Sequence, residues 1–161
     1  MKSYAIKYLL LSFGISLTVN ASIAQENLSE QEYHQWLKDK FSDQHERLIP
    51  VVAVADMYFA CNKVKKIDPV PYRVPDLLKR MDREQLAEKL IECLGTHDIQ
   101  SDIAINYGLE GCFYEQLADK PKQEHDEKMK LVRKAIASLS REERQKSLTQ
   151  CVTSQAIAYL K

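Results

Sequence analysis

The four cysteines of this 161-residue chain all follow an N-terminal segment with the pattern of an export signal. They are Cys61, Cys93, Cys112 and Cys151. An exported chain meets an oxidising compartment, where an even number of thiols is expected to pair. Two disulfides would constrain the fold more than any other feature, because each holds two distant Cα atoms within about 6 Å.

The export segment covers residues 1–24. Lys2 and Lys7 precede an apolar stretch, Tyr8 to Val19, and small residues lead to Ala24. Basic start, apolar middle and small-residue end are typical of a signal peptide, and they fit a buried helix of a cytosolic protein less well. The apolar stretch is shorter than the roughly 20 residues that span a bilayer. We predict cleavage after Ala24, a periplasmic or secreted location, and no stable membrane insertion of the mature chain.

The charge balance of the mature chain argues against two classes of partner. The full sequence has 23 basic and 23 acidic side chains, and residues 1–24 contain two of the basic ones and no acidic one. The mature chain therefore has 21 positive and 23 negative side chains, a net charge of −2. This balance gives no electrostatic reason to bind nucleic acid or an anionic membrane.

Helical patterns cover almost the whole mature chain, and we predict an all-α fold. Capping boxes at Ser29 with Glu32 and at Ser140 with Glu143 mark two helix starts. The predicted organisation is an amphipathic N-terminal helix within residues 25–46 and a helical, disulfide-bonded domain over residues 47–161. Within that domain we expect a compact bundle of about five to six helices. They are expected at residues 49–66, 76–81, 82–95, 101–120, 122–138 and 140–160.

An internal similarity suggests how the cysteines pair. The segments 81–94 and 139–152 align with a capping residue, Arg-Glu, a leucine and a cysteine in register. The chain therefore has the pattern of two related three-helix units, although capping signals recur by coincidence wherever helices start. In an up-down-up unit the first and third helices are parallel neighbours. Among the three possible connectivities, this arrangement favours Cys61–Cys93 and Cys112–Cys151.

Motifs for known chemistries are absent from the sequence. It contains no Cys-x-x-Cys, no His-Glu-x-x-His, no Gly-x-Ser-x-Gly and no glycine-rich phosphate loop. We therefore nominate no catalytic residue, no metal ligand and no cofactor, and we predict that the protein is not an enzyme. The alternative is a composite metal or acid–base site that uses some of the four histidines, which are His34, His45, His97 and His125.

The candidate partner-binding surface is the amphipathic N-terminal helix. Tyr33, Trp36, Leu37 and Phe41 recur there at helical spacing. An apolar helix face can lie in the groove of a partner protein, or it can close the protein's own core. From this face we predict a non-catalytic exported protein that binds another exported protein, as an assembly factor, inhibitor or chaperone.

Two alternative functions follow from other residues. A carrier of a small apolar ligand could form its cavity from methionine and aromatic side chains, which suit irregular ligands but more commonly form simple core. The candidate lining residues are Met57, Tyr58, Leu109, Phe113, Met129 and Ile157. An unrecognised enzyme is the second alternative. Gly108 and Gly111 predict either a close approach of another backbone or a ligand at that point, because glycine inside a helix costs about 1 kcal/mol relative to alanine.

Overall fold

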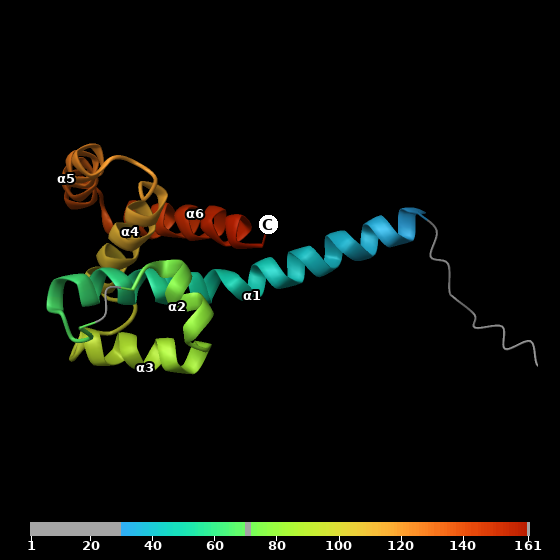
Figure 1. The fold of residues 1–161 in the computed structure, drawn as a ribbon, viewed down its shortest axis with the longest axis horizontal. Helices are drawn as coiled ribbons and strands as arrows, with labels where there is room; N and C mark the ends of the chain where they lie inside the picture. The colour runs from blue at the N-terminus through green and yellow to red at the C-terminus, as the bar shows by residue number, and fades with distance from the viewer. Residues whose placement is uncertain (1–29, 70–71, 161) are drawn as a thin grey trace, which may run out of the picture.

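The computed structural model describes residues 30–69 and 72–160, and this part of the chain is all-helical (Figure 1). The predicted signal peptide and Ser29 lie outside the described residues. The six helices are α1 (Glu30–Lys65), α2 (Val74–Arg80), α3 (Arg83–Leu94), α4 (Asp102–Gln116), α5 (Lys122–Ser138) and α6 (Arg141–Tyr159). The all-α bundle predicted from the sequence is therefore confirmed.

Helix α1 is longer than the sequence suggested. Pro50 was expected to separate two helices, but α1 runs through it without a break. A proline inside a helix has no amide to bond the carbonyl four residues earlier, here that of Glu46. Both residues are exposed, so water can satisfy that carbonyl and the helix continues. The division of the chain at residues 46 and 47 stays a prediction.

The helix boundaries follow local capping chemistry. The side chains of Asp82, Ser101 and Ser140 each accept a hydrogen bond from an amide three residues on, at the starts of α3, α4 and α6. Gly95 ends α3 with a φ of +66°, a left-handed conformation that favours glycine. Pro75 lies in the first turn of α2, where a missing amide costs nothing, and α2 begins two residues earlier than expected.

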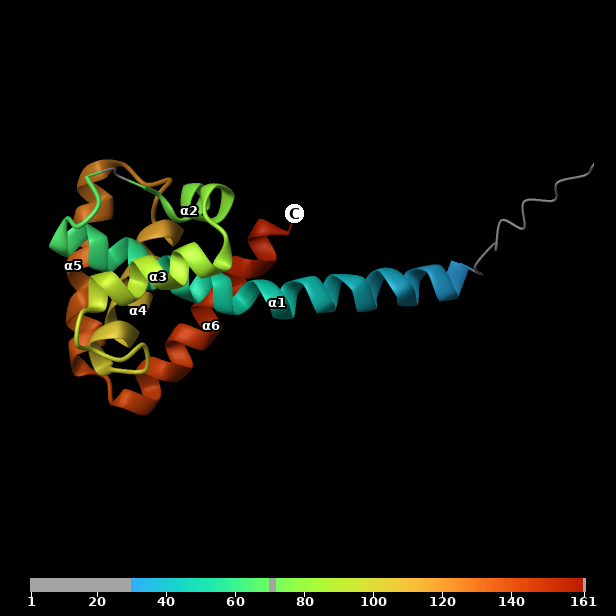
Figure 2. The same cartoon turned by 90° about the horizontal axis from the view of Figure 1, so that it is seen from below.

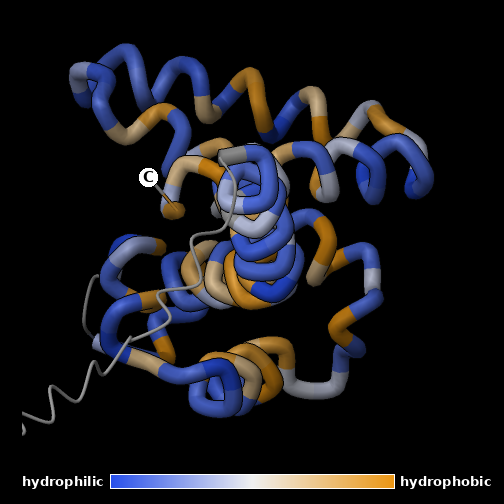
Figure 3. The backbone as a smooth tube through the Cα atoms, turned by 90° about the vertical axis from the view of Figure 1, so that its right-hand side faces the viewer, coloured by the Kyte–Doolittle hydropathy of each residue, from blue (hydrophilic) through white to orange (hydrophobic). Residues whose placement is uncertain are grey.

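The C-terminal half of α1 lies at the centre of the bundle. Figure 2 shows α1 and α3 side by side and running in the same direction, and Figure 3 looks along α1 with the other helices around it. Helix α1 contacts α2, α3, α4 and α6, whereas α5 lies against α4. The largest fully buried apolar side chains come from α1, α2, α3 and α4; they include Tyr58, Leu77, Leu86, Leu90 and Leu109.

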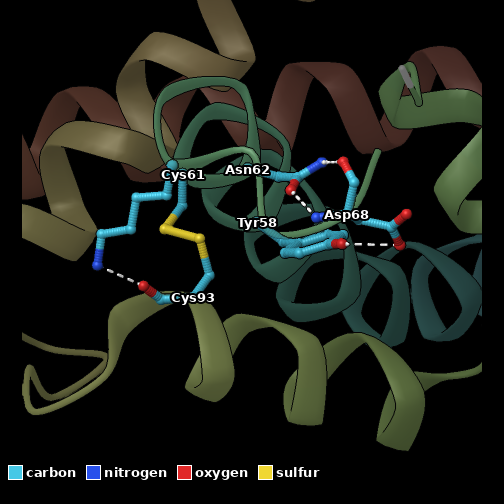
Figure 4. Close-up of a disulfide and its surroundings, with 6 residues drawn as sticks. Tyr58, Cys61, Asn62, Asp68 and Cys93 are labelled. Carbon is cyan, nitrogen blue, oxygen red and sulfur yellow. Dashed lines mark hydrogen bonds between the residues drawn. A yellow bond between two sulfur atoms is a disulfide. The ribbon is translucent and has the colours of Figure 1, made fainter. Parts of the chain in front are cut away.

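Two disulfides join helices that are two apart in the chain. Cys61 of α1 is bonded to Cys93 of α3 with Cα atoms 6.2 Å apart (Figure 4). Cys112 of α4 is bonded to Cys151 of α6 with Cα atoms 6.3 Å apart. The favoured connectivity is therefore confirmed. Helices α1–α3 and α4–α6 share this arrangement, while a common origin of the two units stays a prediction. Two disulfides indicate an oxidising, non-cytoplasmic compartment.

Gly111 allows α4 to approach α1 closely. A Cβ atom built at Gly111 would lie 2.7 Å from the backbone carbonyl carbon of Asp56 in α1, which is closer than real Cβ contacts. At Gly108, one turn earlier, a Cβ would meet side chains instead, with Leu148 Cδ1 at 2.9 Å. The close approach predicted from these glycines is therefore confirmed at Gly111. It places the backbones of α1 and α4 in direct contact beside the Cys112–Cys151 bridge.

Candidate functional site

The N-terminal half of α1 projects from the bundle (Figures 1 and 2). Every described side chain between residues 31 and 44 is exposed. At 1.5 Å per residue, residues 30–44 make an arm of about 22 Å. We call these residues the α1 arm. Its apolar rings are accessible, because 48% of Tyr33, 48% of Trp36 and 43% of Phe41 is exposed.

The exposed rings share one face of the arm. At 100° per residue, Tyr33, Trp36 and Phe41 fall within an arc of about 140°. Leu37 occupies a position within this arc, but its side chain lies outside the described structure. The rings of Tyr33 and Trp36 stack with centroids 6.1 Å apart. On another face, Gln35 Nε2 donates to Asp39 Oδ1 at 2.8 Å, so the arm is amphipathic while standing in solvent.

The arm joins the body at His45. One ring nitrogen of His45, Nε2, lies 3.0 Å from the backbone oxygen of Thr153 in α6. Leu48 and Ile49 follow and pack against the core. The interpretation that Tyr33, Trp36 and Phe41 close the protein's own core does not describe this structure, in which all three are exposed. Their role in partner binding stays a prediction.

A cleft on the opposite end of α1 forms a second candidate site. It has a volume of about 680 Å³, within the range of about 300–1,000 Å³ that small-molecule sites occupy. It lies between the C-terminal turns of α1, the segment before α2, and the connection from α4 to α5. None of the six cavity residues expected from the sequence lines this cleft; Met57, Tyr58, Leu109 and Met129 are buried in the protein interior.

Aromatic rings form the apolar part of the cleft. Tyr114 of α4 contacts Phe59 of α1 at a centroid distance of 5.0 Å, and the ring of His125 of α5 meets it edge-on at 4.3 Å. The ammonium of Lys63 lies 3.4 Å from the centroid of the Tyr114 ring. This is a cation–π contact, in which the electron-rich face of the ring attracts the cation. Tyr72 adds a further ring to the wall.

A polar network braces the cleft beside the first disulfide (Figure 4). Asn62 Nδ2 donates to the backbone oxygen of Asp68 at 3.2 Å, and the Asp68 amide donates to Asn62 Oδ1 at 2.7 Å. The hydroxyl of Tyr58 donates to Asp68 Oδ2 at 3.4 Å, and Lys89 Nζ lies 3.5 Å from the same oxygen. Burial and the nearby charge of Asp68 raise the pKa of Tyr58 to about 12, so this hydroxyl stays a donor.

The four histidines occupy different environments. His34 and His97 are exposed, and His45 contacts Thr153. Only His125 among them lines the cleft, where it is buried. Across residues 30–69 and 72–160, no group of three or more His, Cys, Asp or Glu side chains is placed to hold a metal ion. The expectation of a non-enzyme stays a prediction.

Comparisons with protein-family models, with curated proteins and with solved structures each gave no match for this chain. Of the described helices, none combines the length and the apolar character that a bilayer crossing needs. The arm could be found from the sequence, whereas the cleft could not. The available signal was a lysine-rich helix end, Lys63 to Lys66, followed by prolines, together with a helix start at Pro121. Neither segment has a chemical motif, and only the fold brings them together.

Proposed function

We propose that the protein is exported to the periplasm or secreted, and that it binds another exported protein through the apolar face of the α1 arm. The exposure of Tyr33, Trp36 and Phe41 on a helix that projects from a disulfide-bonded body supports this proposal. An amphipathic helix of this kind binds by laying its apolar face into a groove of the partner. The role is non-catalytic, of the assembly-factor, inhibitor or chaperone type.

The aromatic side chains of the arm are suited to supply binding energy. Tyrosine and tryptophan bury large areas with few rotatable bonds, and they are enriched among residues that dominate binding energy. Burial of an apolar surface contributes about 25 cal/mol per Å² removed from water. Half of the surface of Tyr33 and Trp36 is still available for such burial.

A site-specific photocrosslink in the native host tests the proposal. A photoreactive phenylalanine analogue replaces Trp36 in one variant and Asp39, on another face of the arm, in a matched control. Partner binding through the apolar face predicts a crosslink to one exported protein from position 36 and little or none from position 39. The same crosslink should disappear when Tyr33→Ser and Phe41→Ser are added. A control variant with three substitutions on the polar face of the helix should keep the crosslink; its substitutions are Gln35→Ser, Ser42→Ala and Glu46→Ser.

Two results would contradict the proposal. Equal crosslinking from positions 36 and 39 would indicate random encounters rather than docking through one face. Crosslinks only between copies of this chain would replace a separate partner with self-association. Thermal unfolding of each variant checks that its body is folded, and exposed residues of the arm should leave the melting temperature unchanged.

The alternative of a small apolar-ligand carrier has less support. Met57, Tyr58, Leu109 and Met129 are each at most 7% exposed and lie in the interior. The main cleft is instead rimmed by charged side chains, which do not suit a wholly apolar ligand. Its chemistry points to a different class of molecule.

A further inference from the structure

The cleft between α1, α4 and α5 is strongly biased towards positive charge. Its lining includes five basic side chains but only two acidic ones, Asp68 and Asp126. Asp68 already pairs with Lys89, which does not line the cleft; Asp68 Oδ2 and Lys89 Nζ are 3.5 Å apart. The basic lining residues are Lys63, Lys66, Arg73, Lys120 and Lys122. This bias contrasts with the nearly neutral chain as a whole, so like charges are gathered here from separate elements of the fold.

The four lysines of the cleft are only partly compensated by the protein: Lys120 contributes, after Lys128, to the lowered pKa of Glu124. Within the described residues, no carboxylate lies within ion-pairing distance of any of them, whereas Arg73 pairs with Glu115 at 2.6 Å. The ammonium of Lys63 lies over two aromatic rings, 3.4 Å from the centroid of Tyr114 and 5.8 Å from that of Phe59. Like charges in one concave site repel each other and raise the local concentration of anions.

Two features of α5 add to the case for an anion. The helix begins at Pro121 without a side-chain cap, so its first amides lack the partners that a cap supplies. Such a helix start attracts negative charge through its free N–H groups and the helix dipole. The side chain of His125, one turn later, is only 8% exposed, and its Nε2 is buried without a hydrogen-bond partner among the described residues. Buried polar atoms of this kind are normally satisfied, in many cases by a ligand or water.

We propose that this cleft binds a small organic anion with a flat apolar body. The body packs against the rings of Phe59, Tyr72 and Tyr114, and a phosphate or carboxylate group lies among the lysines at the start of α5. Both halves of the ligand are needed, because the aromatic wall alone would accept any apolar molecule and the lysines alone would bind simple anions weakly. The site lies on the body, away from the α1 arm, and does not depend on the arm's proposed function.

An amide-resolved NMR titration of the mature, disulfide-intact protein tests the proposal with four probes. Naphthyl phosphate and naphthoate contain both an aromatic body and an anionic group, naphthol lacks the charge, and inorganic phosphate lacks the body. We expect both naphthyl anions to shift the amides of residues 59–69 and 114–126. Their dissociation constants should be roughly tenfold or more below that of naphthol, because charge-assisted hydrogen bonds are stronger than neutral ones. They should also be roughly tenfold or more below that of inorganic phosphate, because only the naphthyl anions bury an apolar body against the rings.

Matched double variants locate the binding site. Lys63→Gln with Lys122→Gln should weaken binding of naphthyl phosphate by tenfold or more. Lys79→Gln with Lys146→Gln removes the same charge from exposed positions outside the cleft and should change binding by less than about twofold. The amide spectrum of each unliganded variant shows whether it is folded. Naphthol binding as tight as naphthoate, shifts confined to other surfaces, or equal losses in both double variants would each overturn the proposal.

Discussion

Gln155 Nε2 of α6 donates a hydrogen bond to Asp56 Oδ1 of α1 at 3.2 Å, within the buried core. Asp56 is fully buried, and among the described residues neither its second oxygen, Oδ2, nor Oε1 of Gln155 has a hydrogen-bond partner. A neutral carboxyl group would give both unpaired oxygens a partner. The protonated Oδ2 of Asp56 could then donate to Oε1 of Gln155, while Nε2 of Gln155 donates to Oδ1 of Asp56. The acid–amide pair therefore fits a protonated Asp56 better than a charged one.

The stability that Asp56 contributes should consequently fall as pH rises through the acidic range. Burial raises the pKa of Asp56 well above its ordinary value; the hydrogen bond from Gln155 opposes this shift, and the charge of Glu115 adds to it. Above the unfolded pKa of about 3.9, the unfolded chain has lost a proton that the folded chain keeps. The contribution of Asp56 to the free energy of unfolding therefore decreases with rising pH until the folded pKa is passed. Tyr159, which contacts Gln155, stays neutral throughout, because burial raises its pKa to about 12.

Asp56→Asn isolates this effect, because an amide can make both hydrogen bonds without a charge. Urea unfolding between pH 4 and pH 8 should show a stability advantage for Asp56→Asn that grows with pH. Asp56→Ala, which removes the carboxyl partner of Gln155 and leaves it only its contact with Tyr159, should lose about 1–3 kcal/mol at the acidic end of the range. If the free energy of unfolding depends on pH in the same way for the wild type and Asp56→Asn, then Asp56 titrates alike in the folded and unfolded chains, and this account is wrong.

A methyl group at Gly111 should separate α1 from α4. In Gly111→Ala the new Cβ would lie 2.7 Å from the Asp56 carbonyl carbon, and a backbone cannot move aside without moving its helix. We expect a loss of about 1–3 kcal/mol or more in the free energy of unfolding. Gly108→Ala is the matched control, because its Cβ meets side-chain atoms, the Cδ atoms of Leu148 and Cγ of Met57, and the substitution gains helix propensity of about 1 kcal/mol. Equal losses in the two variants would contradict this account.

Local signals in the sequence were sufficient for much of the fold. The capping residues Asp82, Ser101 and Ser140 each mark an observed helix start, since a cap depends only on neighbours three residues away. The disulfide pairing followed from parallel first and third helices. Pro50 was misread, because whether a helix continues through a proline depends on how the freed carbonyl is solvated, which local pattern does not reveal.

Of the two candidate sites, one could be found from the sequence and the other could not. The apolar face of the α1 arm is periodic in sequence, so Tyr33, Trp36 and Phe41 could be found, but periodicity did not tell whether that face is buried or exposed. The cleft was beyond reach, because Lys63 and Lys122 are 59 positions apart and only the contact of α4 with both α1 and α5 brings them together. Sites assembled across elements require the tertiary arrangement.

Each disulfide should stabilise the fold by a similar amount. The bridged residues are separated by 32 and 39 positions, and loop closure of that length corresponds to about 3.7 and 3.9 kcal/mol in the unfolded chain. Cys61→Ser with Cys93→Ser, and Cys112→Ser with Cys151→Ser, should therefore lower the free energy of unfolding by comparable amounts. Mass spectrometry of the mature protein should find no free thiol before reduction. A double variant as stable as the wild type would show that its bridge contributes nothing.

Removal of the α1 arm should leave the body intact. Residues 31–44 are exposed wherever their side chains are described, and the contact with α6 begins at His45. Deleting residues 25–44 from the mature chain should therefore change the free energy of unfolding by less than about 0.5 kcal/mol, as is usual for surface changes. Leu109→Ala, in the buried core, should instead cost about 2–5 kcal/mol and provides the reference for a structural loss. A deletion that destabilises the protein as much as Leu109→Ala would mean that the arm packs on the body in solution, and the face formed by Tyr33, Trp36 and Phe41 would then be unavailable to a partner.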